Sequence, residues 1–163
     1  MEYHSVTFHD YLGRRGYSST NQAILRMIPN SLIQPGFHLV WRYWNPLCGY
    51  LLFLLYRRLG PRKYIATIIT FTTSGFLFHD LFIFLVFGIF SFIFTLSFLF
   101  YSVVYITMSK KHYSTTHLYN GSKISIAFLN LSFIIGGLII GYFINCFIFP
   151  NSFISKLTHL TLF

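Results

Sequence analysis

Two long stretches of this sequence carry no charged side chain, residues 81–108 and residues 124–150. A helix needs roughly 20 mostly apolar residues to cross the hydrocarbon core of a membrane, and each stretch is longer than that. Charged residues make up 9% of the chain, whereas a soluble domain carries roughly a quarter. A chain with so little charge does not cover a water-facing surface. The sequence therefore predicts an all-α integral membrane protein with several passes.

The basic residues of the chain flank its apolar segments. The formal net charge is +9, which in a soluble protein would suggest nucleic acid as a partner. Beside membrane helices, Lys and Arg instead face anionic lipid headgroups and set the orientation of the protein. We therefore expect membrane lipids as partners and no nucleic acid. The basic loops at residues 57–63 and 109–123 fall on one side of a four-helix arrangement, the expected cytoplasmic side.

Helix signals divide the chain into a polar, interfacial N-terminal segment, residues 1–36, and a transmembrane bundle, residues 37–163. In the first segment Ile24 and Ile28 share one face of a short helix that is expected to lie on the membrane and to end at Pro29. About four transmembrane helices are expected, over residues 46–59, 61–80, 81–108 and 124–149.

Asn45 and Pro46 signal the start of the first of these helices, because Asn is a favoured N-cap and Pro a favoured first helical residue. Gly60 and Pro61 signal its end, and Pro61 is expected to begin the next helix. Residues 37–44 would form a separate short helical piece at the membrane edge. If the first segment re-entered the membrane without crossing it, the N-terminal arginines would join the basic side.

His79 and Asp80 form the most conspicuous polar pair near a predicted span. Ionisable groups inside a membrane are costly, so they usually face the bundle interior or a wet cavity and have a function. The plainer interpretation is an interfacial turn solvated by headgroups. Thr72, Gly75 and His79 share a helical face, and Gly75 permits the close approach of either a ligand or another helix.

A second cluster runs from Trp41 to Pro46. In a binding site, Arg42 would hold an anionic group and Asn45 would donate a hydrogen bond to a carbonyl, with Trp44 beside them. In a purely structural role, the Trp and Tyr rings form an interfacial belt, Arg42 extends to lipid phosphate and Asn45 caps a helix. Both interpretations stay open on the residues alone.

The order of these features resembles the signature region of the membrane-bound O-acyltransferase family. Residues 37–45 read FHLVWRYWN, an apolar helix then ends in Tyr-Arg-Arg at residues 56–58, and residues 70–80 read TFTTSGFLFHD. In that family an aromatic-rich motif closing in Trp-Asn or Trp-His precedes a Ser-Gly/Ala-x-x-x-His motif on an apolar helix. The resemblance covers roughly residues 14–87, and this chain is much shorter than typical family members.

The resemblance implies that His79 is the catalytic histidine and Asn45 the second motif residue. Members of the family transfer an acyl group, commonly from the co-substrate acyl-coenzyme A, to a hydroxyl acceptor. His79 would act as the base, and Asn45 would orient the acceptor or donate to the carbonyl oxygen. Arg42, Trp44, Thr72 and Gly75 are the candidate substrate-binding residues. No bound cofactor is expected, and no zinc-type spacing of ligands indicates a metal site.

The competing hypothesis is a non-catalytic assembly subunit of a larger membrane complex. The Phe-rich residues 81–108 and the glycines at 136, 137 and 141 suit contacts between helices. Against a full-sized acyltransferase, the helices that complete the acyl tunnel are missing, so either a partner or a second copy supplies them or the chain is a reduced relative that no longer catalyses. The two hypotheses differ at Asn45 and His79, which must face one cavity in an enzyme and need not do so in a structural subunit.

Overall fold

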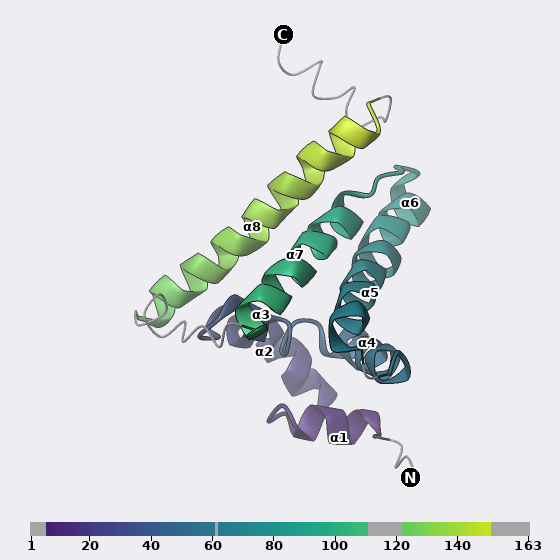
Figure 1. Ribbon diagram of the computed structural model, residues 1–163. Helices are drawn as coiled ribbons and strands as arrows, with labels where there is room; N and C mark the ends of the chain where they lie inside the picture. The colour runs from purple at the N-terminus through teal and green to yellow at the C-terminus, as the bar shows by residue number, and fades with distance from the viewer. Residues whose placement is uncertain (1–5, 61, 111–121, 151–163) are drawn as a thin grey trace.

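The computed structural model describes residues 6–60, 62–110 and 122–150, and within these ranges it contains helices and no strand. Four short helices at the N-terminal end lie together at one end of a bundle of long rods (Figure 1). The elements in chain order are α1 (Phe8–Gly13), α2 (Thr20–Leu32), α3 (Phe37–Val40), α4 (Pro46–Arg58), α5 (Lys63–Gly75), the π-helical turn η1 (Phe76–Asp80), α6 (Leu81–Phe87), α7 (Ile93–Lys110) and α8 (Lys123–Ile148).

Three helices in the described part of the chain are long and apolar enough to cross a membrane. They are Lys63–Phe87, Ile93–Lys110 and Lys123–Ile148. The first is a continuous rod of 25 residues in which α5, η1 and α6 follow one another. The third matches the helix expected over residues 124–149, so that prediction is confirmed.

The predicted boundary at His79 and Asp80 is wrong, and so is the single helix over residues 81–108. The chain passes through His79 and Asp80 in the π turn and breaks only at Gly88, whose φ of +68° gives α6 a left-handed cap. Glycine adopts this conformation without the steric penalty of a side chain. Residues 88–92 then form a non-helical connection before α7.

Helix α4 begins where the sequence predicts, but it is too short to count among the long helices. Asn45 accepts a hydrogen bond from the Cys48 amide as the N-cap, and Gly60 has a φ of +78° after the last turn. The 13 residues of α4 rise about 20 Å at ~1.5 Å per residue. The structure thus has three long apolar helices where about four were expected. Pro61 lies outside the described residues, and α5 begins at Lys63.

The N-terminal segment is more ordered than its sequence suggested. Thr7 and Asp10 form a capping box that starts α1, an element that the sequence patterns did not predict. Helix α2 contains Pro29 within its last turns and continues to Leu32, so the predicted end at Pro29 is wrong. Ile24 and Ile28 are 42% and 53% exposed, as a helix that rests on a membrane or on a partner requires.

Small residues let the long helices approach closely. A methyl group added at Gly75 would lie 2.5 Å from the Phe94 carbonyl oxygen of α7, and one at Gly141 would meet the Ile93 carbonyl oxygen at 2.6 Å. At Gly137 it would overlap the Tyr101 ring, whereas Gly136 has nothing within 4 Å. The expected role of this glycine cluster in helix contacts is therefore confirmed for Gly137 and Gly141, and Gly136 takes no part in these contacts.

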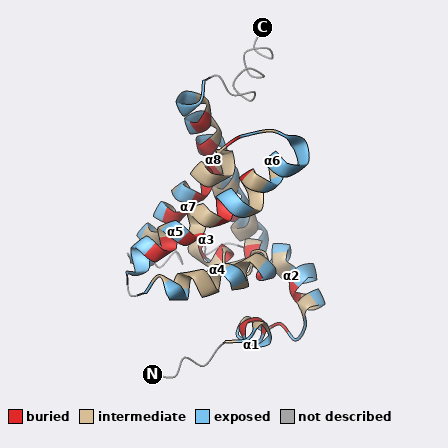
Figure 2. Ribbon diagram, turned by 90° about the vertical axis from the view of Figure 1, so that its right-hand side faces the viewer, coloured by how far each residue is buried: buried red, intermediate tan, exposed pale blue. Residues whose placement is uncertain are grey.

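The core of the bundle is an aromatic cluster in which α3 inserts between the long helices. Phe37 and Val40 are fully buried against Phe98 and Tyr101 of α7. The Trp41 ring packs against Tyr101 with centroids 5.1 Å apart. Figure 2 shows buried residues along the facing sides of the helices, and α6, which buries none of its residues, in pale blue and tan. The short segment before α4 thus packs into the hydrophobic core between the long helices.

Candidate functional site

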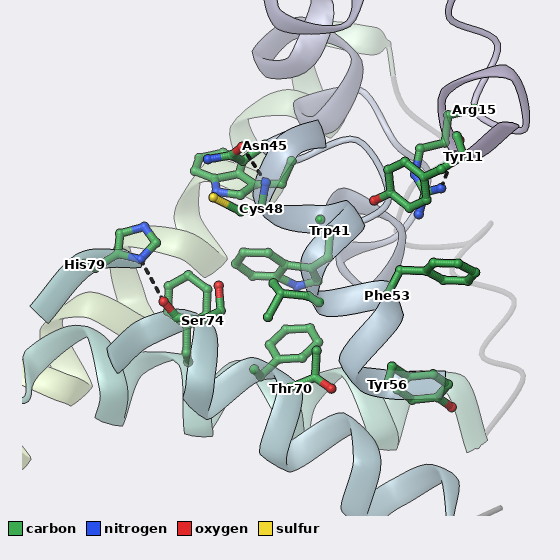
Figure 3. Close-up of a pocket in the computed structure, with 15 residues that line it drawn as sticks. Tyr11, Arg15, Trp41, Asn45, Cys48, Phe53, Tyr56, Thr70, Ser74 and His79 are labelled. Atoms are coloured by element: carbon green, nitrogen blue, oxygen red, sulfur yellow. Dashed lines mark hydrogen bonds between the residues drawn. The ribbon is translucent and has the colours of Figure 1, made fainter. Parts of the chain in front are cut away.

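A cavity of about 200 Å³ lies between the N-terminal helices and the long helices α5 and α7. Residues from five parts of the chain meet there, which Figure 3 shows as sticks. Aromatic and aliphatic side chains make up most of its wall, and the polar groups include Asn45, Cys48, Thr70 and His79. An apolar cavity with a few convergent polar groups is the usual form of a small-molecule site.

His79 is held at the cavity by the π turn and by two aromatic rings. Its ring stacks on Phe94, with centroids 5.0 Å apart, and packs against Phe98 at the same distance. Its Nδ1 lies 3.2 Å from the Ser74 carbonyl oxygen, five residues earlier in the chain. Because a carbonyl only accepts, Nδ1 carries the proton in this contact and Nε2 keeps its lone pair. The π turn, a feature common at functional sites, therefore leaves the imidazole able to act as a base.

Asn45 enters the same cavity from the start of α4. Its φ of +36° is the only positive value at a non-glycine residue among the described residues, and such strain is tolerated best by Asn and Asp. The side-chain oxygen accepts from the Cys48 amide at 3.2 Å. Since the oxygen is used for capping, the amide nitrogen is the part of Asn45 that can donate to a ligand.

The two residues of the aromatic motif that flank Tyr43 lie in different places. Trp44 lines the same cavity as His79. Arg42 does not, and lines a neighbouring cavity of about 480 Å³. The Arg42 side chain is exposed and donates through Nη2 to the Arg14 carbonyl oxygen at 3.2 Å.

The other two candidate substrate-binding residues lie outside the cavity wall. Gly75 faces the Phe94 and Thr95 backbone of α7, so its missing side chain serves close helix packing. The Thr72 hydroxyl is buried without a hydrogen-bond partner. The structure therefore assigns Gly75 to helix packing, and neither Gly75 nor Thr72 lines the cavity.

The N-terminal helix α1 supplies wall residues that sequence patterns did not indicate. Tyr11 is 2% exposed, and the Arg15 guanidinium carbon lies 3.5 Å from the centroid of its ring. Burial is the main reason that the pKa of Arg15 lies below its ordinary value and the pKa of Tyr11 above it. The one sequence signal for this pair is the i, i+4 spacing of an aromatic residue and an arginine. Nothing in the sequence indicated that α1 packs against α4.

Asp80 does not pair with His79 and instead caps α7. Its carboxylate accepts hydrogen bonds from the Phe94 amide at 3.1 Å, the Thr95 amide at 2.7 Å and the Thr95 hydroxyl at 2.6 Å. The Ser91 hydroxyl lies 3.4 Å from it. A carboxylate at a helix N-terminus satisfies free amides and interacts favourably with the helix dipole. This explains why an acid 2% exposed is tolerated between apolar helices.

Within the described ranges, no group of three or more His, Cys, Asp or Glu side chains is arranged to hold a metal ion. Cys48 and Cys146 are half-buried free thiols. Comparison with protein-family models, curated proteins and solved structures found no match for this chain.

Proposed function

We propose that this chain is a multi-pass membrane protein of the O-acyltransferase type, with His79 as the general base. The observation that supports this most is the convergence of Asn45 and His79 on one apolar cavity, although 34 positions separate them in the sequence. A structural subunit has no need for this arrangement. With Nδ1 donating to the Ser74 carbonyl oxygen, Nε2 of the neutral ring is the nitrogen that is left to accept a proton.

In the proposed reaction, an acceptor hydroxyl in the cavity attacks the carbonyl carbon of an acyl thioester such as acyl-coenzyme A. His79 Nε2 takes the hydroxyl proton as the new C–O bond forms. The Asn45 amide donates to the carbonyl oxygen while it carries negative charge. The C–S bond then breaks, and His79 returns the proton to the leaving sulfur, which departs as a thiol. The ester and the free thiol are the products.

The proposed membrane arrangement has three crossings, with α4 as a re-entrant or interfacial helix. In the sequence, all but Lys156 of the 12 Lys and Arg residues lie before or at the start of α5, or from the end of α7 to the start of α8. With three crossings these positions fall on one side, which the positive-inside rule makes cytoplasmic. This arrangement removes the conflict that four crossings create for the N-terminal arginines.

The test is acyl transfer by the purified chain in lipid, with labelled acyl-coenzyme A and a panel of hydroxyl acceptors. We expect His79→Ala to lower the rate by at least about a hundredfold, the usual range for a general base. His9→Ala is the matched control, because His9 is exposed on α1 and should keep full activity. Full activity in His79→Ala would contradict the mechanism.

A second variant separates the two roles of Asn45. Asn45→Asp keeps a capping oxygen and a residue that tolerates the positive φ, but it removes the amide donor. We expect normal assembly and strongly reduced transfer. Normal assembly with unchanged transfer would assign Asn45 to capping alone.

A non-catalytic subunit is the second candidate. The cavity of about 200 Å³ is smaller than the roughly 300–1,000 Å³ usual for ligand pockets. Such a small volume favours a site that other subunits or a second copy would complete. Transfer that requires the native partner chains and is unchanged by His79→Ala in that complex would support this candidate, whereas its loss in the variant would make His79 part of a shared active site.

A further inference from the structure

A second cavity, of about 480 Å³, adjoins the His79 cavity, and its lining includes three arginines. The two cavities share Arg15, Trp41, Tyr56, Thr70 and Phe71 as wall residues. Arg14 and Arg42 line the second cavity alone. One wall is thus shared by an apolar space and a space that three arginines help to line.

Among the described residues, the hydrogen bonds of Arg15 and Arg42 go to backbone carbonyls and to no carboxylate, whereas the charge of Arg14 acts on Asp10. Arg15 donates from Nε to the Arg42 carbonyl oxygen at 2.7 Å and from Nη1 to the Tyr11 carbonyl oxygen at 3.3 Å. Arg42 donates to the Arg14 carbonyl oxygen. Asp80 serves α7, and Asp10 bonds to Thr7. Several guanidinium donors therefore remain for a ligand.

Arg15 and Arg42 also repel each other. Burial is the main cause of the lowered pKa of Arg15, and the charge of Arg42 lowers it further, whereas the neighbouring tyrosines act in the opposite direction. Two cations held together without an acid are stabilised when an anion binds between them. The half-buried position of Arg15 reduces screening by salt and strengthens that effect.

Buried donors without partners face the same region. The Thr70 hydroxyl and the Trp41 indole nitrogen have no hydrogen-bond partner, and Thr70 is 9% exposed. A buried donor left without a partner costs free energy, so such groups usually indicate a ligand or water that is bound in the working protein. Both residues belong to the wall that the two cavities share.

We propose that the Arg15–Arg42 cavity binds the phosphate group of an amphiphile whose apolar part enters the His79 cavity. Arg15 and Arg42 hold the phosphate oxygens, Thr70 donates to the same ligand, and the rings of Trp41 and Phe71 contact the first part of its apolar chain. This is a binding site and involves no transfer step. It therefore holds whether or not His79 acts as a base.

The experiment measures binding to the purified full chain in neutral lipid nanodiscs. The probes are a monoacyl glycerol phosphate, the monoacylglycerol with the same acyl chain, and inorganic phosphate. We expect the phosphate amphiphile to bind at least about tenfold more tightly than either of the other two, and its affinity to fall as salt rises. Equal affinity for the two amphiphiles would overturn the proposal. Inorganic phosphate binding as tightly as the amphiphile would also overturn it, because the apolar cavity would then contribute nothing.

Three variants locate the site. Arg42→Gln should weaken binding of the phosphate amphiphile about tenfold, the loss of one charge-assisted hydrogen bond. Arg26→Gln is the charge-matched control on the exposed face of α2 and should bind normally. Thr70→Val should weaken binding without lowering the melting temperature of the unliganded protein, since its hydroxyl has no partner there. Equal effects of Arg42→Gln and Arg26→Gln would mean that binding depends only on the general positive charge of the surface, and would refute the site.

Discussion

At the scale of single residues, the structure separates two neighbours that the sequence presents as a pair. His79 faces the cavity and Asp80 faces the start of α7. Adjacent residues on a helix point in directions about 100° apart, and the two side chains therefore reach different partners. The function of Asp80 could not be read from the sequence, because its partners Phe94 and Thr95 lie 14 and 15 residues further on.

The role of Asp80 leads to a stability prediction. Asp80→Asn keeps one acceptor oxygen but turns an NH₂ group toward the Phe94 and Thr95 amides, which themselves only donate. We expect the free energy of unfolding in bicelles to fall by about 2 kcal/mol, the usual cost of unsatisfied buried donors. A double-mutant cycle with Thr95→Val tests the contact itself, since residues that share a hydrogen bond have non-additive effects. Strictly additive losses would exclude the contact.

At the scale of elements, the sequence predicted those helices whose ends carry local signals. Asn45-Pro46 and Gly60 bound α4, and α8 lies within a few residues of its expected limits. The π turn and the break at Gly88 were missed because Phe76–Phe87 is apolar on both sides of His79 and Asp80. Helix α1 has a local start signal in Thr7 and Asp10, but it is only six residues long, and its packing against α4, through Tyr11 beside Gly49, joins residues far apart in the chain.

The contact between α7 and α8 provides a prediction with an internal control. Gly141→Ala places a methyl group against the Ile93 carbonyl oxygen and the Ser97 side chain, so the helices must move apart. Overpacking of this kind costs about 1–3 kcal/mol of unfolding free energy. Gly136→Ala meets nothing within 4 Å and should be neutral, or stabilising by up to about 1 kcal/mol through helix propensity. Unfolding in mixed micelles measures both variants, and equal losses would contradict the packing.

Helix α1 provides a prediction about pH. Hydrogen bonds from Thr7 hold the pKa of Asp10 below its ordinary value of 3.8. A carboxyl with a lowered folded pKa stabilises the fold fully above that ordinary value and loses the contribution as pH falls through the folded pKa. Protection of the α1 amides, relative to their intrinsic exchange rates, should therefore fall in acid, and Asp10→Asn should remove this pH dependence. An unchanged acid response in that variant would assign the effect to another group.

At the scale of the whole molecule, the number of crossings decides on which side of the membrane the basic N-terminal helices lie. Three crossings put α1, α2 and the Arg15–Arg42 cavity on the same side of the membrane as the loop between α7 and α8. They place the 88–92 connection on the opposite side. Four crossings would separate the N-terminal helices from that loop. The arginines then lie opposite the basic loops, and the orientation rule is violated. Only the first arrangement lets a ligand reach the Arg15–Arg42 cavity from the cytoplasm.

Labelling with a membrane-impermeant maleimide tests this arrangement. In a background where Cys48 and Cys146 are replaced by Ser, Asn21→Cys and Phe90→Cys each place one exposed thiol, on α2 and in the 88–92 connection. We expect Phe90→Cys to react in intact cells and Asn21→Cys to react only after permeabilisation, because three crossings put these positions on opposite faces. Ser122→Cys, before α8, should behave as Asn21→Cys does. Reaction of Asn21→Cys in intact cells, with Ser122→Cys protected, would establish four crossings. It would place the Arg15–Arg42 cavity on the face opposite the basic loops, where the same binding measurements would have to use ligands supplied from outside.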